Sequence, residues 1–401
     1  MNRLSPVPAP PLWLLVLVTL SGTLAMHMFV PALGEAARDL ATSPAAIQST
    51  ITLYIVGLAL GQLVYGPVSD HIGRRPTLLF GLGLFALAGL VCMLAQSVGL
   101  LVAARFMQAL GGCAGLLLAR AIVRDTASPQ DTMRRLATMQ LITMVGPGLA
   151  PLIGGLVVTA LGWRWIFAIF VLLGVAGFVA TWRMLPETRA PRQSGAASRS
   201  VMADYGILLR SPAFLGCVIG GGCATASFYA FVAAAPFLLG ERFGQPVTMV
   251  GACLALLIVG VSIGNFASAR LAARGRLTRI MLAGNTLSTA CAAALMLQLA
   301  HGPASVTSVM ATMFLYCVGA GICSPAVITK AMSIQPSVAG SASGIYGSGQ
   351  MAIGAISTAA VGLGHDHGVM AAAVLLAASI VAQLSFRIVR RTAPDVGLGA
   401  A

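Results

Sequence analysis

The chain has 401 residues, of which 8% are charged and 58% are hydrophobic, and its mean hydropathy is +0.92. Soluble proteins carry about 25% charged residues, so this composition excludes a soluble globular protein and indicates an integral membrane protein. The formal net charge of +14 would suit a nucleic-acid partner, but the basic residues fall in short loops between apolar runs, where membrane topology accounts for them. We therefore expect a lipid bilayer around the chain and no nucleic acid bound to it.

Apolar runs of about 20 residues, each long enough to cross a hydrocarbon core of about 30 Å, follow one another along the chain. They lack the alternation of barrel strands, so the spans are predicted to be helices. The first run is too long for the core of a signal peptide and should itself span the membrane. We predict twelve spans, at residues 11–34, 45–65, 77–96, 98–121, 136–159, 164–184, 212–237, 247–269, 279–300, 304–328, 340–362 and 369–388.

Residues 185–211 form the longest polar stretch and are predicted to be a cytoplasmic linker. The linker separates an N-terminal six-helix bundle (1–184) from a C-terminal six-helix bundle with a short cytoplasmic tail (212–401). With the N-terminus inside, the only loop arginines on the outer side are Arg38, Arg164 and Arg242. The positive-inside rule then places both termini in the cytoplasm of a multi-pass inner (plasma) membrane protein.

A short polar loop follows the second run, with Gly66, Asp70, Gly73, Arg74 and Arg75 as its key residues. Gly66 is expected to allow close backbone approach, and Gly73 a tight turn. Asp70 can accept hydrogen bonds at a helix start or pair with a neighbouring arginine. We expect a cytoplasmic loop that helps to gate the protein.

The fourth run contains Arg105, followed by Gln108 in the pattern R-x-x-Q-A-x-G. A charged side chain inside a membrane is costly and by default suggests a function. The alternative is an arginine that reaches the outer interface.

The fifth run carries G-P-G-L-A-P-L-I-G-G at residues 146–155. Proline interrupts the backbone hydrogen bonds of a helix, and glycine lets a neighbouring helix approach closely. A helix of this kind can bend and pack at the interface between the bundles, although an ordinary kinked packing helix would show the same pattern. The residues concerned are Gly146, Pro147, Pro151, Gly154 and Gly155.

These patterns resemble those of the major facilitator superfamily. The 66–75 loop is similar to its loop between helices 2 and 3, R-x-x-Q-A-x-G is similar to its helix 4 pattern, and residues 146–155 look like its antiporter motif, with Ala109 and Ala150 in place of glycines. Residues 26–33 (M-H-M-F-V-P-A-L) resemble the helix 1 motif D-M-Y-L-P-A of the Bcr/CflA-type drug exporters, a group that includes chloramphenicol and bicyclomycin efflux proteins. W-R-W-I-F (163–167), F-Y-A-F (228–231) and A-G-S-A-S-G (339–344) look like the same group.

The resemblance implies an all-α major facilitator fold, with twelve transmembrane helices in two six-helix bundles. It also implies proton-coupled multidrug efflux by alternating access rather than an enzyme activity, with a drug-like small molecule and protons as partners. Export or import of an endogenous metabolite is the nearest alternative. A receptor or membrane enzyme without transport is the alternative from another class.

His27 stands where the Bcr/CflA group has an acid, and no Asp or Glu lies deep in the predicted spans. Histidine titrates near neutral pH, so His27 is the predicted proton carrier. Arg105 lies at a similar depth and, if adjacent, would disfavour a charged His27, so that proton loading would need an acidic outer side. The alternatives are a neutral structural histidine, or coupling through Asp70 or Glu35.

The substrate cavity is expected near the membrane midplane, between the bundles. Aromatic and methionine side chains suit apolar substrates of varied shape, and the absence of a buried acid favours neutral or zwitterionic ones. Plain helix packing is the alternative for each candidate. The candidates are Met26, Tyr54, Gln108, Phe228, Tyr229, Phe231, Tyr316, Tyr346 and Gln350.

The eight cysteines lie in apolar runs without a C-x-x-C pair. They are therefore expected to be packing residues, with no disulfide, metal site or cofactor. We expect a monomer, and the identity of the substrate stays open.

Overall fold

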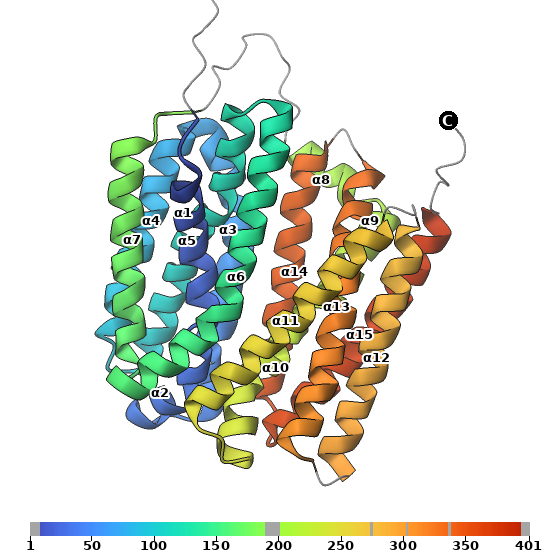
Figure 1. The fold of residues 1–401 in the computed structure, drawn as a ribbon. Coiled ribbons are helices and arrows are strands. Elements are labelled where there is room, and N and C mark those ends of the chain that lie inside the picture. Colours follow the sequence, from blue (N-terminus) through green and yellow to red (C-terminus); the bar gives the residue numbers. More distant parts are fainter. Residues whose placement is uncertain (1–8, 189–200, 273–275, 302–303, 336–337, 394–401) are drawn as a thin grey trace, which may run out of the picture.

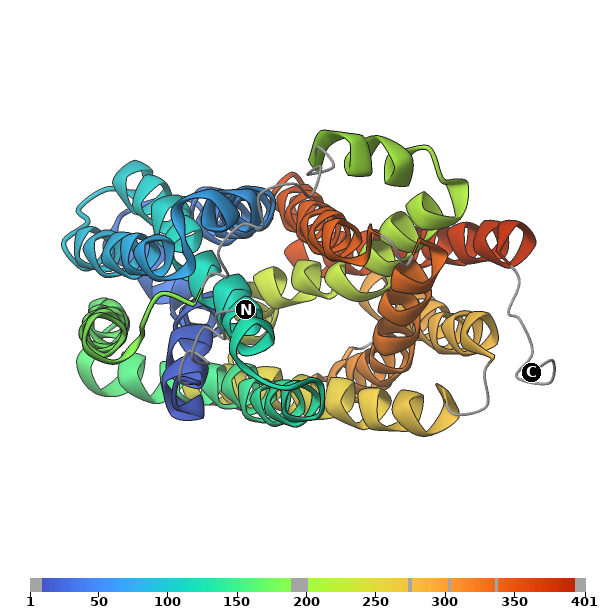
Figure 2. The same ribbon diagram turned by 90° about the horizontal axis from the view of Figure 1, so that it is seen from above.

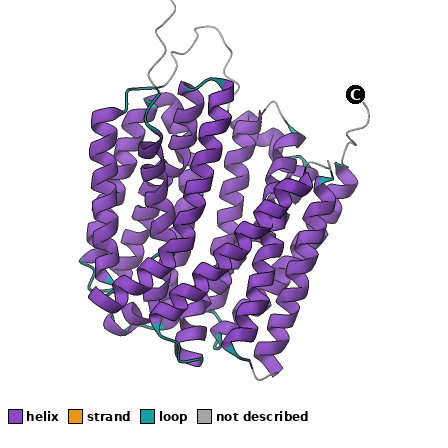
Figure 3. Cartoon of the chain, viewed as in Figure 1, coloured by secondary structure: helices purple, strands orange, loops and turns teal. Residues whose placement is uncertain are grey.

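The computed structural model describes residues 9–188, 201–272, 276–301, 304–335 and 338–393, and over these residues the chain is helical with short connections (Figure 3). The first group of helices comprises α1 (Leu12–His27), η1 (Val30–Ala32), α2 (Leu33–Asp39), α3 (Pro44–Ile72), α4 (Arg74–Met93), α5 (Val98–Thr126), α6 (Pro129–Leu161) and α7 (Arg164–Met184).

The second group comprises α9 (Pro212–Gly221), η2 (Gly222–Ala226), α10 (Phe228–Ala235), η3 (Pro236–Arg242), α11 (Val247–Ala272), α12 (Leu277–His301), α13 (Val306–Ile334), α14 (Ala339–Gly362) and α15 (His367–Thr392). Helix α8 (Val201–Leu209) lies between the groups in sequence, so the predicted linker contains a helix that the sequence did not indicate. Residues 189–200 of that linker lie outside the described residues.

Each predicted span coincides with a helix or with a series of consecutive helices. In the described part of the chain, ten helical segments are long and apolar enough to cross a membrane, and α6 contributes a further apolar segment, Gly146–Leu161. Helix α14, rich in small residues, completes a set of twelve. The first span is interrupted, because α1 ends at His27 and the chain continues through η1 and α2. The seventh is divided among α9, η2, α10 and η3, of which η2 and η3 are π-helical.

The two groups of helices stand side by side (Figure 1). We call the end with the α3–α4 turn at Gly73 the arginine-rich end, and the end with the α6–α7 turn at Gly162 the opposite end. Figure 2 looks down on the molecule from the arginine-rich end, where α1 begins. The two groups meet along two pairs of helices. Helix α6 contacts α11, since a Cβ on Gly155 would touch the backbone of Val247. Helix α3 contacts α14, since a Cβ on Gly362 would touch Gln48.

Close helix packing within the first group depends on glycine. A Cβ at Gly115 of α5 would overlap the carbonyl oxygen of Val18 in α1, and one at Gly112 would lie 3.0 Å from the Cα of Gly22. Small residues at such crossings let two helix backbones approach each other in a bilayer. They fix the height of α1 against α5, and therefore the positions of the polar side chains on both helices.

The expected 66–75 loop is much shorter than predicted. Helix α3 continues through Pro67 to Ile72, and α4 begins at Arg74, so only Gly73 remains as the turn. Gly73 has φ 116°, a conformation that favours glycine, as the sequence indicated. The expectation for Gly66 was wrong, because it lies inside α3 with nothing within 4 Å of the position of a Cβ.

Candidate functional site

A cavity of about 270 Å³ lies between the two groups of helices. Helices α1, α5 and α6 line it on one side, and η2, α10, α11, α13 and α14 on the other. Its wall combines apolar side chains with hydroxyl, amide and basic groups, as small-molecule sites in proteins do. The polar lining residues are Thr19, Thr23, His27, Arg120, Thr225, Tyr229, Ser262, Ser324 and Gln350.

Helix α1 presents one polar stripe to this cavity. Thr19, Thr23 and His27 are four residues apart and therefore lie on the same helix face. The Nδ1 of His27 lies 2.9 Å from the carbonyl oxygen of Thr23, so Nδ1–H donates and Nε2 of the neutral ring is an acceptor. The His27 ring is also 6.2 Å from that of Tyr229, across the boundary between the two groups.

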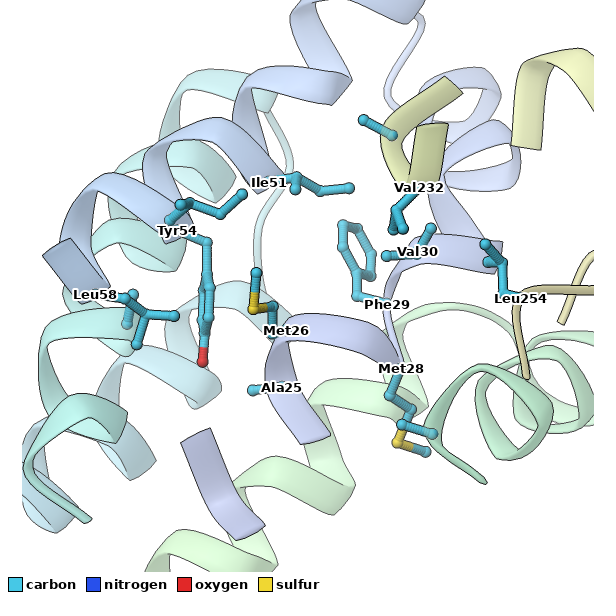
Figure 4. Packing of buried hydrophobic residues seen from close by; sticks show 14 of the residues in the cluster. Ala25, Met26, Met28, Phe29, Val30, Ile51, Tyr54, Leu58, Val232 and Leu254 are labelled. Atoms are coloured by element: carbon cyan, nitrogen blue, oxygen red, sulfur yellow. The ribbon is translucent and has the colours of Figure 1, made fainter. Parts of the chain in front are cut away.

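His27 lies at the closed end of the cavity. The same side chain lines a separate void of about 10 Å³, whose other walls are apolar and include Val30, Pro151, Val232 and Leu254. Val30, Val232 and Leu254 belong to the hydrophobic cluster drawn in Figure 4. A void of that size has room for about one water molecule. His27 is therefore the last polar side chain lining the cavity before this apolar packing begins.

Three of the nine predicted substrate residues line the cavity: Phe228, Tyr229 and Gln350. Gln350 also reaches Thr225, with Nε2 donating to Oγ1 at 2.6 Å. The other six do not line it, because their side chains are engaged in apolar packing or in internal hydrogen bonds. They are Met26, Tyr54, Gln108, Phe231, Tyr316 and Tyr346, all of them less than 10% exposed.

Met26 and Tyr54 lie in the hydrophobic cluster of Figure 4. The hydroxyl of Tyr54 donates to the carbonyl of Gly22 at 2.8 Å, which fixes α3 against α1. In the second group, Tyr316 shares a 2.9 Å hydrogen bond with Ser227. These side chains hold helices together and do not face the cavity.

Arg105 is fully buried, so it does not reach the outer interface. Its Nη1 donates to Oε1 of Gln108 at 2.7 Å and its Nη2 to the carbonyl of Ala25 at 2.9 Å. The guanidinium carbon lies 4.0 Å from the centre of the Tyr54 ring, with Phe29 also in range. A buried cation is stabilised by such charge-assisted bonds and aromatic faces.

Arg105 and His27 lie on different sides of α1. Arg105 binds α1 at Ala25, and two residues correspond to about 200° around a helix. His27 faces the cavity, and Arg105 is not among the described residues that line it. The adjacency on which an effect of Arg105 on His27 would depend is therefore not present, because Arg105 contacts α1 on the side that faces away from the cavity.

Helix α6 contacts both α1 and α11. A Cβ on Gly146 would meet Leu20, and one on Gly154 would overlap the carbonyl of Met28. Gly155 faces Val247 of α11, and Pro147 lines the cavity. Pro147 and Pro151 both lie inside the helix, where each removes a backbone donor. The motif thus lies at the interface between the two groups.

At the arginine-rich end, Arg74 joins three helices. Its Nη1 lies 2.6 Å from Asp70 of α3, and its Nε donates to Asp125 of α5 at 2.9 Å. The backbone N–H groups of Arg74 and Arg75, at the start of α4, donate to the carboxylate of Glu187 at 2.9 and 3.2 Å. The predicted pairing of Asp70 is present, but Glu187, rather than Asp70, caps α4.

Sequence reasoning missed Asp125, Glu187 and Arg120. Arg120 lies inside the predicted span 98–121, so its charge was a usable signal. The four-residue spacing of Thr19, Thr23 and His27 was a second signal. Glu187 follows the end of α7 and carries no local pattern that links it to α4.

The opposite end is closed by contacts between the groups. The Nε2 of Gln48 donates to the carbonyl of Ala233 at 3.0 Å, and Thr52 donates to Thr358 at 2.9 Å. Contacts between α3 and α14 extend as far as Gln62 beside Gly347. Arg120, which lies toward the arginine-rich end, is exposed.

A family model described as Major Facilitator Superfamily matches residues 15–358. The chain belongs to the major facilitator superfamily. Its membership makes it a multi-pass membrane transporter and not an enzyme. The twelve-helix fold that the sequence predicted is the fold of this superfamily.

Among the superfamily relatives, the bicyclomycin resistance protein homolog of Haemophilus influenzae is 30% identical over 337 residues, which cover 82% of this chain and 83% of that protein. Multidrug resistance protein D of Escherichia coli is 31% identical over 344 residues, 84% of each chain. These similarities confirm the resemblance to Bcr/CflA-type exporters. A bacterial homologue of the human lysosomal transporter Spinster, solved inward-facing and unoccupied, matches with a TM-score of 0.75 at 15% identity and covers 97% of this chain and 98% of that one. At that identity the match shows the fold alone.

Proposed function

We propose that the protein exports drug-like small molecules across the inner membrane in exchange for protons, by alternating access. One observation carries the proposal. A cavity between the two groups of helices ends at a histidine, beyond which the two groups are packed together. The names of the relatives, which refer to bicyclomycin and multidrug resistance, support a drug as the substrate.

The positive-inside rule supports a cytoplasmic location for the arginine-rich end and for both termini. In that orientation the contacts of Gln48 and Thr52 close the periplasmic side, and the cavity belongs to an inward-facing state. Alternating access would require these contacts to break while others form at the arginine-rich end. The cluster around Arg74 joins helices of the first group only, so its proposed part in gating is to keep α3, α4 and α5 moving as one body.

His27 is the proposed proton carrier. Nδ1–H is engaged by Thr23, which leaves Nε2 to take up the exchanged proton. His27 borders both the cavity and the closed region, so opening the opposite end would bring it into contact with the other side of the membrane. Arg105 supports this site indirectly, by holding α1 at Ala25.

Both groups of helices of one chain supply the walls of the cavity, which supports a monomer as the transporting unit. The first proposed bundle, 1–184, ends where α7 ends, and the second, 212–401, begins where α9 begins. Each chain then holds a complete site.

The test uses inverted membrane vesicles with an imposed pH gradient and a proton-sensitive dye, to which chloramphenicol or bicyclomycin is added. The wild type should release protons when the drug is added, and His27→Ala should not. His301→Ala is the matched control, because His301 is exposed at the end of α12 and does not line the cavity. Drug-dependent proton release that persists in His27→Ala would reject His27 as the carrier. No release with either drug, from a protein that elutes as a folded species, would contradict drug export.

A further inference from the structure

Arg120 places a positive charge on the wall of the cavity. It belongs to α5, lines the cavity and is exposed there. No carboxylate is present among the described residues that line the cavity, and the other basic side chain on this wall is His27. In a site of low dielectric, a fixed positive charge attracts anions and repels cations far more strongly than it would in water.

Arg120 and His27 mark opposite ends of the cavity. Helix α5 runs antiparallel to α1, with Gly112 beside Gly22 and Gly115 beside Val18. Continued along the helices, this register puts Arg120 level with the beginning of α1, about 20 Å from His27 at 1.5 Å per residue. A compound held at Arg120 can therefore extend along the cavity toward Phe228 and Tyr229, which lie at the His27 end.

We propose that Arg120 binds a carboxylate of the transported compound. The guanidinium fork matches the two oxygens of a carboxylate, and Ser324, on the facing helix α13, supplies a hydroxyl group to the same cavity. Phe228 and Tyr229 offer apolar faces for the rest of the compound. The substrate class is then an aromatic or apolar molecule with an acidic group, either an anion or a zwitterion. This inference rests on the proposed function, because it names the substrate of the same cavity.

The experiment measures dye binding to the purified full-length protein in nanodiscs, with empty nanodiscs as the blank. Fluorescein carries a carboxylate, and rhodamine 123 has the same ring system with that carboxylate esterified and a positive charge. Fluorescence anisotropy gives the affinity of each dye for the wild type, Arg120→Gln, Arg120→Lys and Arg124→Gln. Arg124 is the matched control, since it lies one turn farther along α5 and does not line the cavity.

We expect the wild type to bind fluorescein more tightly than rhodamine 123. Arg120→Gln should weaken fluorescein binding by about 10- to 100-fold, the size of one or two charge-assisted hydrogen bonds. Arg120→Lys should retain part of the affinity, because lysine keeps the charge without the fork. Arg124→Gln should change it by less than about twofold, as expected for an exposed charge. Thermal unfolding of each variant checks that the fold is intact.

Wild-type binding of rhodamine 123 as tight as that of fluorescein would overturn the proposal, as would an equal loss of fluorescein binding in Arg120→Gln and Arg124→Gln. The assay does not depend on transport, so it separates this inference from the proposed function. If the protein binds fluorescein through Arg120 but releases no protons in the vesicle experiment, the anion site at Arg120 is supported and proton-coupled export is rejected.

Discussion

The side-chain amide of Gln48 in α3 donates to the backbone carbonyl of Ala233 in α10 at 3.0 Å, and both residues are buried. One turn along α3, Thr52 makes the corresponding bond to Thr358 of α14. These bonds join the first group of helices to the second at the end of the molecule beyond His27. A neutral hydrogen bond contributes about 1 kcal/mol net, so each of these two bonds can break and form again during a transport cycle.

Gln48→Ala should therefore shift the population toward a state that is open at this end. The loss of about 1 kcal/mol corresponds to roughly a fivefold change in the equilibrium constant. Spin labels at Ala45 and Leu363, two exposed positions on α3 and just beyond α14, would report the shift as a larger fraction of long distances. Ser49→Ala is the control, because the Ser49 hydroxyl bonds only to the backbone of its own helix. An unchanged distance distribution in Gln48→Ala would show that this bond does not hold the closed state.

Arg105 and Gln108 should act as one unit. Arg105→Gln leaves the carbonyl of Ala25 and the amide of Gln108 without their charged donor, and the loss of a buried hydrogen bond from a charged group costs about 2 kcal/mol. Gln108→Leu removes the other partner. We expect the double variant to be less destabilised than the sum of the single variants, by about 1 kcal/mol. Thermal unfolding in detergent measures this coupling, and strictly additive losses would mean that the 2.7 Å bond contributes nothing.

The two acids that bind Arg74 should contribute unequally. Asp70 is 57% exposed in its side chain and Asp125 is 24% exposed, so solvent screens the first ion pair more than the second. Asp70→Asn should cost about 0.5 kcal/mol or less and Asp125→Asn about 1 kcal/mol. Unfolding at low and high salt would separate the variants, since salt weakens exposed pairs most. Equal losses for both variants would contradict this ranking.

Gly115 and Gly66 should respond in opposite ways to alanine. At Gly115 a Cβ overlaps the carbonyl of Val18, so Gly115→Ala must push α1 away from α5. We expect a loss of about 2 kcal/mol or more, as for other overpacked sites, together with reduced transport. Gly66 has open space around it, so Gly66→Ala should be neutral or slightly stabilising, because alanine favours a helix by about 1 kcal/mol over glycine. Thermal unfolding of both variants tests the pair, and damage from Gly66→Ala would reveal a contact that forms in another state.

The approximate positions of the membrane-spanning helices along the chain follow from the sequence alone. The span 164–184 coincides with α7, and Gly73 is the turn that its residue type suggested. The pairing of Asp70 with Arg74 was also predictable. These features depend on residues close in sequence, on the length and hydropathy that a bilayer imposes, and on the conformational freedom of glycine.

Only the tertiary structure decided which side chains face the cavity. In a membrane, the lipid side and the protein side of a helix are both apolar, so hydropathy carries little information about helix rotation. The sequence placed His27 and Arg105 at a similar depth, but rotation of α1 set them on opposite sides. The contact of Glu187 with the start of α4 depends on how α7 ends beside it. Arg120 is the clearest case, because its charge was visible in the sequence, whereas its place on the cavity wall depends on how α5 packs against α1.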